Sequence, residues 1–334
     1  MQSGATVRAN YLWTALRRAR GKSAGQFVRW TLLNVWPLSF LTRSYYRLRW
    51  APPIRQRLNR KAICALRENP PSLDAEQSRC VRELSSDGIC ATTLASLTGD
   101  ADLFARVRGE SERLLASPEN TRQIANRRAD RTPKWYVIRG LGYGFGATLP
   151  AAVAEVCLHP RILAVASTYL GACCRLCYAN VWYNIPTAPD EPSIDSELWH
   201  RDHEDRNIVK VYVYLEDVDE QMGPLSYLRG TQPGGAYGDV YPVTSPAGSY
   251  PRAERLNERV PATTAISCPG SAGTVILCDT AGFHRGGRST TRPRILLTAT
   301  YVSDSGIDRR RYELEPSAAS NPLDLAARFA LWQA

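Results

Sequence analysis

Two kinds of periodicity divide the chain into an early helical part and a later part that is rich in strands. Five apolar residues fall on one face of a predicted helix: Leu103, Phe104, Val107, Leu114 and Leu115. Two more helices are predicted over 151–158 and 161–170, because Pro150 and Pro160 stand where first-turn prolines belong and Gly171 follows as a stop. We therefore expect a helical layer over residues 71–171.

Beyond Gly171 the pattern changes to short runs typical of strands, separated by turns rich in Pro and Gly. Six such runs are predicted: 175–184, 197–202, 208–216, 225–229, 274–279 and 294–302. Strands that follow one another without intervening helices indicate a mostly antiparallel sandwich or roll. The predicted fold is mainly β with flanking helices, with a jelly-roll core over 172–305 and a tail with a short helix over 311–334.

Composition agrees with a folded chain. With 334 residues, of which 44% are hydrophobic, the protein can bury a full core, which excludes a disordered or fibrous class. The nine Cys are an odd number in a chain too long to need disulfide staples, so we expect free thiols and a cytoplasmic location.

The net charge of +10 has its origin at one end of the chain. The first 67 residues hold fourteen of the 42 Lys and Arg residues and no carboxylate, together with four of the eight Trp. We treat residues 1–70 as a basic, aromatic extension. Its longest uncharged stretch, 30–42, is well short of the roughly 20 apolar residues that a membrane-spanning helix needs.

Three interpretations of this extension stay open. It can lie at an anionic membrane surface, at the inner face of a membrane, through residues 1–67. It can be an organelle presequence, or a pair of amphipathic helices packed on the body with Arg facing water. No nucleic-acid partner is expected, because no zinc-finger, RNP or heptad pattern accompanies the charge.

The scarcest residue type marks the candidate chemistry. Only four His occur, and two of them lie in the segment WHRDHED, residues 199–205. On a strand, residues two apart share a side, so His200 and Asp202 can present an imidazole and a carboxylate to one point. A third metal ligand must come from elsewhere, and the remaining His are His159 and His284.

Two His and one carboxylate with open positions form the ligand set of non-heme Fe(II) oxygenases. A 2-oxo acid and O2 can occupy those open positions. The distal carboxylate of 2-oxoglutarate then needs a fixed cation with two parallel donors, which Arg supplies. Arg294, at the start of the next apolar strand after His284, fits this need, and Arg292 is the fallback.

Residues 199–231, WHRDHEDRNIVKVYVYLEDVDEQMGPLSYLRGT, resemble the core of the phytanoyl-CoA dioxygenase family of Fe(II)/2-oxoglutarate-dependent oxygenases. Further similarity lies in HPRILAVASTYLG (159–171), GFHRGG (282–287) and PRILLTATY (293–301). The resemblance covers roughly residues 80–305. It implies a double-stranded β-helix, with His200, Asp202 and His284 as iron ligands and Arg294 as the anchor of 2-oxoglutarate.

Other residues are weighed against the same pattern. Tyr212 matches an aromatic position that lines the pocket in this family, and Asn180 and Trp182 on the preceding strand are expected to reach the same pocket. With Arg294, Tyr212 and Asn180 are the residues that we expect to bind the co-substrate. Lys210 shares a strand face with Tyr212 and can therefore meet an anionic substrate, although a solvated strand Lys is the commoner outcome. Gly286 stands where some members place a Ser that helps hold the co-substrate.

The sequence therefore predicts a dioxygenase domain over 71–310 that uses Fe(II), 2-oxoglutarate and O2. The expected reaction is hydroxylation of an unactivated carbon in a small-molecule or lipid-like substrate, with 2-oxoglutarate decarboxylated to succinate. Two alternatives remain: a non-catalytic membrane-surface or partner-binding protein on the same fold, and a cupin-like metalloenzyme that does not use 2-oxoglutarate.

Overall fold

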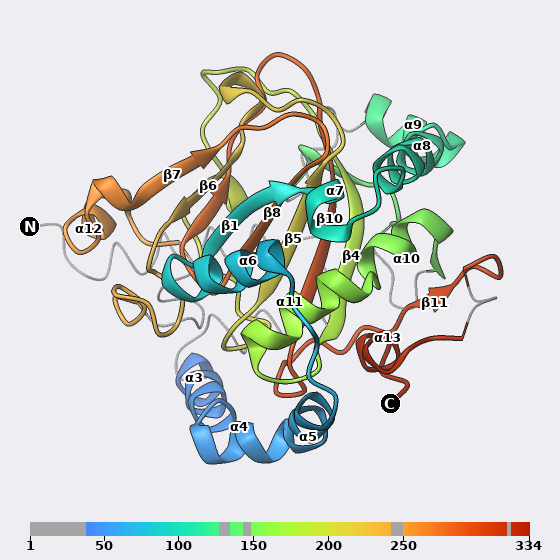
Figure 1. Cartoon of the computed structure of the whole chain (residues 1–334). Coiled ribbons are helices and arrows are strands. Elements are labelled where there is room, and N and C mark those ends of the chain that lie inside the picture. The colour runs from blue at the N-terminus through green and yellow to red at the C-terminus, as the bar shows by residue number, and fades with distance from the viewer. Residues whose placement is uncertain (1–37, 127–133, 143–147, 242–249, 319–321) are drawn as a thin grey trace, which may run out of the picture.

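The computed structural model describes residues 38–126, 134–142, 148–241, 250–318 and 322–334 (Figure 1). The helices of the described part precede the main sheet or flank it: α3 Leu38–Arg49, α4 Pro52–Leu58, α5 Arg60–Glu68, α6 Ala75–Ser86, α7 Leu94–Thr98, α8 Leu103–Leu115, α9 Pro118–Asn126, α10 Ala151–Cys157, α11 Pro160–Leu170, α12 Ala253–Asn257 and α13 Leu325–Ala330. Three short 3-10 turns add η1 Asp195–Glu197, η2 Glu220–Met222 and η3 Ala262–Thr264.

Two antiparallel sheets form the centre of the molecule. The larger has the strand order β1-β8-β5-β10-β4-β2 and the smaller β7-β6-β9. Their strands are β1 Ile89–Thr93, β2 Val137–Arg139, β4 Arg175–Asn184, β5 Val209–Tyr214, β6 Leu225–Leu228, β7 Ala265–Cys268, β8 Thr274–Asp279, β9 His284–Gly286 and β10 Arg294–Val302. A short parallel pair, β3 Thr148–Leu149 with β11 Glu313–Leu314, lies apart from both. The prediction of a mainly β protein with a jelly-roll core and flanking helices is confirmed.

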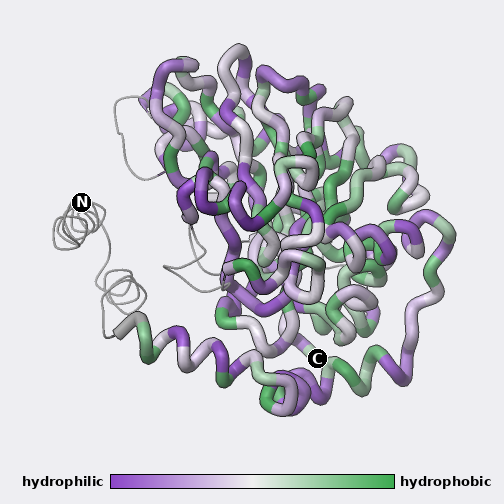
Figure 2. Tube along the Cα trace, turned by 90° about the vertical axis from the view of Figure 1, so that its left-hand side faces the viewer, coloured by the Kyte–Doolittle hydropathy of each residue, from purple (hydrophilic) through white to green (hydrophobic). Residues whose placement is uncertain are grey.

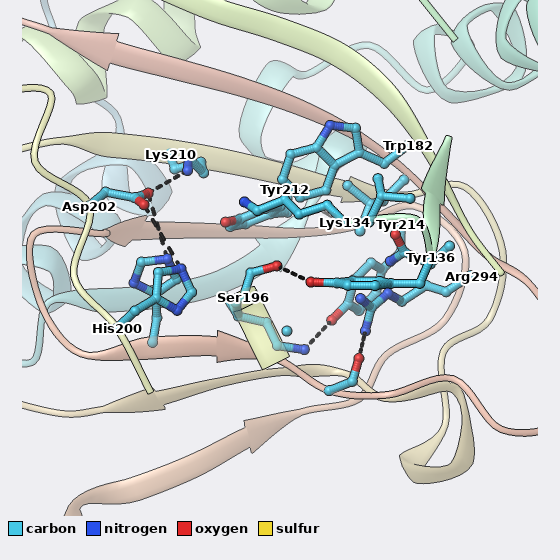
Figure 3. Close-up of a pocket in the computed structure, with 17 residues that line it drawn as sticks. Lys134, Tyr136, Trp182, Ser196, His200, Asp202, Lys210, Tyr212, Tyr214 and Arg294 are labelled. Atoms are coloured by element: carbon cyan, nitrogen blue, oxygen red, sulfur yellow. Dashed lines mark hydrogen bonds and ion pairs between the residues drawn. The ribbon is translucent and has the colours of Figure 1, made fainter. Parts of the chain in front are cut away.

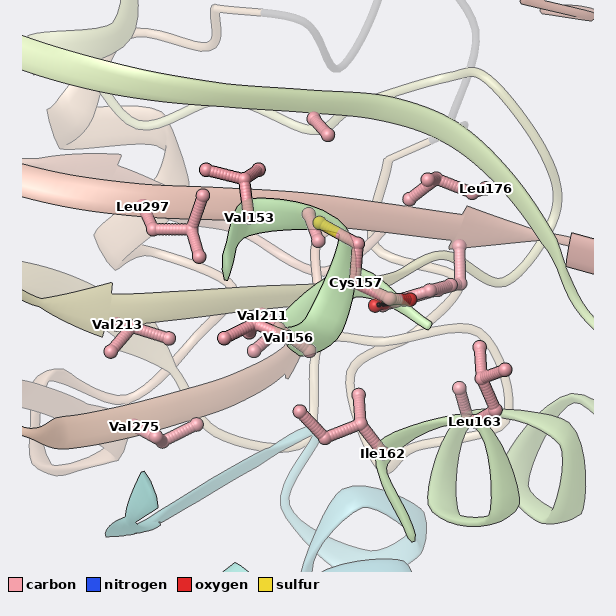
Figure 4. Close-up of a cluster of buried hydrophobic side chains, with 14 of the residues drawn as sticks. Val153, Val156, Cys157, Ile162, Leu163, Leu176, Val211, Val213, Val275 and Leu297 are labelled. Carbon is pink, nitrogen blue, oxygen red and sulfur yellow. Dashed lines mark hydrogen bonds between the residues drawn. The ribbon is translucent and has the colours of Figure 1, made fainter. Parts of the chain in front are cut away.

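The two faces of the large sheet have different partners. On β5, Val209, Val211 and Val213 belong to the main hydrophobic core, which the sheet forms with α10, α11 and other helices (Figure 4). The alternate residues Tyr212 and Tyr214 point to the other face and pack against the small sheet. β5 is therefore buried on both faces. One face packs on the main hydrophobic core, and the other faces the space between the two sheets.

The helical layer follows the predicted spacing. The apolar face of α8 buries Leu103, Val107 and Leu115, and α11 stops at Gly171, whose φ of +69° is a left-handed conformation that Gly adopts without strain. Pro160 opens α11 as predicted, whereas Pro150 precedes α10 as its N-cap residue.

One stretch of the described residues has the length and composition of a membrane span, Ala151–Leu170, with mean hydropathy 1.2. It comprises α10, α11 and the residues between them, and 61% of it is buried inside the molecule. Its apolar residues pack on the large sheet (Figure 4). Its hydropathy is explained by its place in the core.

The described part of the basic extension lies along the lower edge of the molecule in Figures 1 and 2, and it contacts the body through the end of α3 and through α5. Tyr46 and Trp50 stack on each other and contact Ile307, while Arg49 donates to the carbonyls of Ser305 and Gly306 at 2.6 and 3.0 Å. These contacts agree with the packed-helix interpretation for part of the segment, except that Arg49 contacts the body where that interpretation has Arg facing water. Residues 1–37 lie outside the described part, so membrane contact there stays a prediction.

Candidate metal centre and cavity

Three side chains from distant parts of the chain meet between the two sheets. His200, Asp202 and His284 each offer one ligand atom, and these atoms lie within 4.8 Å of one another (Figure 3). Asp202 Oδ1 is 3.9 Å from His200 Nε2, and Asp202 Oδ2 is 3.6 Å from His284 Nε2. One ion can contact all three groups, and the donor set is the two-His, one-carboxylate set that suits non-heme iron.

The backbone places these ligands without a continuous strand. His200 and His284 exchange both of their backbone hydrogen bonds at 3.0 Å, and Asp202 N–H donates to the carbonyl of Thr280 at 2.8 Å. The predicted strand over 197–202 is wrong, because this segment begins in η1 and makes only an isolated bridge. It pairs first with β9 of the small sheet and then with the turn after β8, so it crosses between the sheets and belongs to neither.

The predicted alternation of side chains nevertheless survives in the extended backbone. His200 and Asp202 line the cavity, while Arg201 points the other way and is 2% exposed. The Arg201 guanidinium donates to the backbone carbonyls of Ala281, Thr231 and Gly238 at 2.5, 2.7 and 3.1 Å. Arg201 therefore fastens the chain behind the centre to three neighbouring turns.

Each imidazole is oriented by a carbonyl two residues earlier in the chain. His200 Nδ1 lies 2.8 Å from the carbonyl oxygen of Leu198, and His284 Nδ1 lies 3.1 Å from that of Gly282. Nδ1–H donates in both cases, which leaves each Nε2 lone pair facing the cavity. Burial lowers the pKa of His284 to about 4 and the pKa of His200 well below its ordinary value, so both rings are neutral at pH 7, as metal ligands must be.

Asp202 has a partner that the sequence did not lead us to expect. Lys210 on β5 lies 8% exposed, and its Nζ is 2.5 Å from Asp202 Oδ2. Burial alone would raise the pKa of Asp202, but the Lys210 ammonium, together with the two nearby imidazoles, lowers it further than burial raises it and holds that pKa well below its usual range. The expectation of a solvated Lys210 is wrong, because the face of β5 that carries it is covered by the small sheet and by the segment after His200.

Arg294 lies at the other end of the same cavity (Figure 3). Its Nη2 and Nε donate to the Asn184 amide oxygen at 2.6 and 2.9 Å in the amide orientation that satisfies both groups, and Nη1 donates to the carbonyls of Gly287 and Met222 at 3.2 and 3.4 Å. Among the described residues no carboxylate forms an ion pair with this guanidinium. A buried cation hydrogen-bonded only to neutral oxygens is suited to receive the carboxylate of a ligand.

The fallback, Arg292, has a different environment. Its Nε lies 2.9 Å from the Met222 sulfur, its Nη2 donates to the carbonyl of Asp217, and it does not line the cavity. His159 is likewise outside the centre, where its Nδ1 accepts from the backbone N–H of Arg161 at the start of α11. Of the alternatives left open by the sequence, the structure brings His284 and Arg294 to the cavity.

The aromatic predictions had mixed outcomes. Tyr212 and Trp182 line the cavity, with their ring centroids 6.3 Å apart. Asn180 does not line it, because its amide is held by the backbone N–H of Leu141 and the carbonyl of Gly142. Assignment of Asn180 to the co-substrate therefore lacks support from its position.

The lining residues that were not recognised from the sequence include Lys134, Tyr136, Ser196 and Tyr214. Tyr136 and Ser196 hydrogen-bond each other at 2.7 Å beside Arg294. Tyr214 was within reach of a simple signal, because it follows Lys210 and Tyr212 at the two-residue spacing of one strand face. The others come from the short β2 region and a 3-10 turn, which have no comparable periodicity.

Comparison with known proteins gives a family and a set of similar folds. The sequence model of the phytanoyl-CoA dioxygenase (PhyH) family matches residues 94–295, which is more than half of the chain. No curated protein matches the chain.

Several solved structures are similar in fold. EctD from S. alaskensis in its apoform is 21% identical, with a TM-score of 0.49 over 79% of this chain and 88% of EctD. The non-heme alpha-ketoglutarate-dependent epimerase SnoN from nogalamycin biosynthesis is 21% identical, with a TM-score of 0.47 over 69% of this chain and 84% of SnoN. AviO1 from Streptomyces viridochromogenes Tue57 is 14% identical, with a TM-score of 0.42 over 76% of this chain and 100% of AviO1. Function does not follow from similarities this distant.

The family match includes the cavity and its ligands. Residues 94–295 contain the metal-binding candidates His200, Asp202 and His284, and also Arg294. The resemblance noted in the sequence is therefore confirmed over the part of the chain that builds this centre. The chain belongs to the phytanoyl-CoA dioxygenase family.

Proposed function

We propose that this protein is an Fe(II)- and 2-oxoglutarate-dependent dioxygenase that hydroxylates an unactivated carbon of a small organic molecule. The reaction converts substrate, O2 and 2-oxoglutarate into hydroxylated substrate, succinate and CO2. His200, Asp202 and His284 are the proposed iron ligands, and Arg294 is the proposed anchor for the distal carboxylate of 2-oxoglutarate.

One observation carries the proposal: two neutral His and one carboxylate lie at one end of a cavity, and a buried Arg that has no carboxylate partner among the described residues lies at the other (Figure 3). A 2-oxo acid has a chelating end and, in 2-oxoglutarate, a second carboxylate, so it complements both ends. Family membership supports the same assignment.

The residues around the cavity have separate roles in the proposed reaction. When bound, Fe(II) would supply open coordination positions for the 2-oxo acid and for O2. Leu198 and Gly282 keep the imidazole Nε2 atoms aimed at the cavity, and Lys210 neutralises the Asp202 carboxylate before any ligand arrives. Trp182 and Tyr212 form an apolar wall beside the centre, which gives a carbon-rich substrate a surface to pack on.

The test is formation of succinate from 2-oxoglutarate with added Fe(II) and ascorbate. The wild type is compared with His200→Ala and with His159→Ala, a matched control because His159 lies outside the cavity. We expect His200→Ala to lose succinate formation and Fe(II) binding, and His159→Ala to keep both. Equal turnover by His200→Ala would overturn the proposal.

Two further measurements separate the alternatives. An unchanged affinity for 2-oxoglutarate in Arg294→Ala would favour a cupin-like metalloenzyme without this co-substrate. A protein that neither retains iron nor consumes 2-oxoglutarate would be a binding protein on the same fold. With a substrate in hand, incorporation of one ¹⁸O atom from labelled O2 into the product identifies hydroxylation.

A peripheral membrane location on the cytoplasmic side is part of the proposal and has a separate test. Phe40, Leu41 and Leu48 on α3 are 61–63% exposed, and the helix ends with Arg47 and Arg49. Vesicles of anionic lipid should float with the wild type in a salt-sensitive way and less with the triple Ser variant of these three residues. Equal flotation of both proteins would remove the membrane from the proposal.

A further inference from the structure

The proposed function gives no role to one cation of the cavity, Lys134. Lys134 lines the cavity together with the three metal-binding candidates. Figure 3 shows its side chain running beside Tyr212 toward the end where Asp202 and Lys210 lie. Among the described residues its ammonium forms no hydrogen bond and no ion pair, although Asp202 and Asp195 attract it from a distance.

The charges along the cavity wall do not balance. Among the described residues its charged lining consists of Lys134, Lys210 and Arg294 against the carboxylate of Asp202, because both His are neutral. Lys210 is paired with Asp202, and Arg294 is assigned to the distal carboxylate of 2-oxoglutarate. Fe(II) and the two carboxylates of 2-oxoglutarate carry opposite charges of equal size, so their binding leaves the positive surplus in place. One unit of this surplus lies at the metal, because Asp202 is shared between the metal and Lys210. The other is Lys134, the side-chain cation of the described lining that remains without a counter-charge.

The backbone at Lys134 supports a placement that serves a ligand. Its φ is +58°, in the left-handed region that side chains other than Gly, Asn and Asp seldom adopt. Burial lowers the pKa of Lys134, with a further contribution from the nearby Arg139. Both the strained backbone and the destabilised charge are energetically unfavourable. In folded proteins such unfavourable features are concentrated at functional sites.

We infer that Lys134 binds an anionic group of the substrate, such as a carboxylate or a phosphate, and so selects an acidic organic molecule that packs on Trp182 and Tyr212. The inference rests on the proposed function, because it takes Arg294 as occupied by 2-oxoglutarate. It makes Lys134 a determinant of substrate class, while iron and 2-oxoglutarate bind without it.

Calorimetric titration of the protein loaded with Fe(II) and 2-oxoglutarate, without O2, tests this inference. Three probes of similar size differ in charge: phenylacetate, phenylacetamide and 2-phenylethylamine. We expect phenylacetate to bind at least about tenfold tighter than phenylacetamide, as a charge-assisted contact predicts, and the amine to bind weakest. Phenyl phosphate serves as a second anion and shows whether the site prefers phosphate to carboxylate.

Variants connect this preference to one side chain. Lys134→Met should remove the preference for phenylacetate over phenylacetamide, and Lys134→Arg should keep most of it. Lys61→Met is the matched control, because Lys61 is exposed on α5, and it should behave as the wild type. The affinity of all variants for 2-oxoglutarate should stay within about twofold of the wild type.

Each other outcome counts against the inference. A preference that survives in Lys134→Met, or a wild type that binds no anionic probe at millimolar concentration, overturns it. A loss of 2-oxoglutarate affinity confined to Lys134→Met would assign Lys134 to the co-substrate and leave the proposed function intact. Absence of 2-oxoglutarate binding by the wild type would instead contradict the proposed function itself.

Discussion

The two ends of the cavity solve the problem of buried charge in different ways. At the metal end, the carboxylate of Asp202 already has Lys210 at 2.5 Å, and both imidazoles are neutral and hydrogen-bonded to backbone carbonyls. At the other end, the guanidinium of Arg294 meets only neutral oxygens. The carboxylate of the first end has its counter-charge before a ligand arrives, whereas the guanidinium of the second end depends on a ligand for one.

This difference predicts that the two ends respond to different perturbations. Substitutions at the metal end should change metal affinity and the stability of the empty protein. Substitutions at the Arg294 end should change co-substrate affinity and leave metal binding alone. Four experiments test that separation.

The largest effect is expected for Asp202→Ala. Loss of a metal ligand should weaken Fe(II) binding by more than about 100-fold, beyond the 10–100-fold typical of losing an outer partner of a ligand. Equilibrium dialysis of the wild type, Asp202→Ala and Asp100→Ala measures this directly. Asp100 is a suitable control because it pairs with Arg106 on the surface. Retained Fe(II) affinity in Asp202→Ala would contradict the assignment of the centre.

Lys210→Met should destabilise the metal-free protein by about 3–5 kcal/mol, because it leaves the buried Asp202 carboxylate without its partner. A divalent cation can replace the missing charge, so added Fe(II) or Mn(II) should raise the Tm of this variant more than that of the wild type. Thermal unfolding with and without metal provides the comparison. Equal metal-induced shifts would show that Lys210 and the metal do not share one carboxylate.

Acid should destabilise the metal end of the empty protein. The pKa of His284 is about 4 in the folded state against 6.5 ordinarily, so the unfolded chain takes up a proton first as the pH falls. The stabilising contribution is complete above pH 6.5 and is lost as the pH falls through 4. We expect about 2 kcal/mol less stability at pH 5 than at pH 7 from this ring, and less pH dependence in His284→Gln. Urea unfolding of the metal-free proteins at both pH values tests this.

Arg294→Lys is expected to have the smallest effect. A Lys keeps the charge but loses the planar pair of donors, so the Kd for 2-oxoglutarate should rise about tenfold while Fe(II) affinity stays as in the wild type. Arg292→Lys is the matched control two residues away, since Arg292 does not line the cavity. A parallel loss of Fe(II) affinity in Arg294→Lys would mean that the two ends are not independent.

Much of the scaffold was predictable from the regular spacing of apolar residues within each element. The bounds of β4, β8 and β10 agree with the sequence prediction to the residue, since turns rich in Pro and Gly separate these runs. The segment before Asp202 was mistaken for a strand because an extended chain that crosses between sheets has the same local pattern. The metal ligands could be anticipated from scarce residues at the spacing of a known family.

The sequence could not show the contacts that form only when folding brings distant segments together. From the sequence alone Lys210 resembles a solvated strand position, and only the segment that crosses between the sheets and carries Asp202 makes it a buried ion-pair partner. Lys134 precedes the short strand β2, which pairs with β4 at the edge of the large sheet. No local pattern places it beside residues some 70 positions later in the chain.

The hydrogen bonds from Nδ1 of His200 and His284 to the carbonyls of Leu198 and Gly282 have a consequence for the evolution of the cavity. Since each ring is hydrogen-bonded to a main-chain oxygen of its own segment, exchange of a side chain elsewhere on the cavity wall leaves that hydrogen bond in place. Wall residues such as Lys134 and Trp182 can therefore be substituted during evolution without loss of the hydrogen bonds that orient His200 and His284. A lineage built this way can acquire new substrates one wall residue at a time.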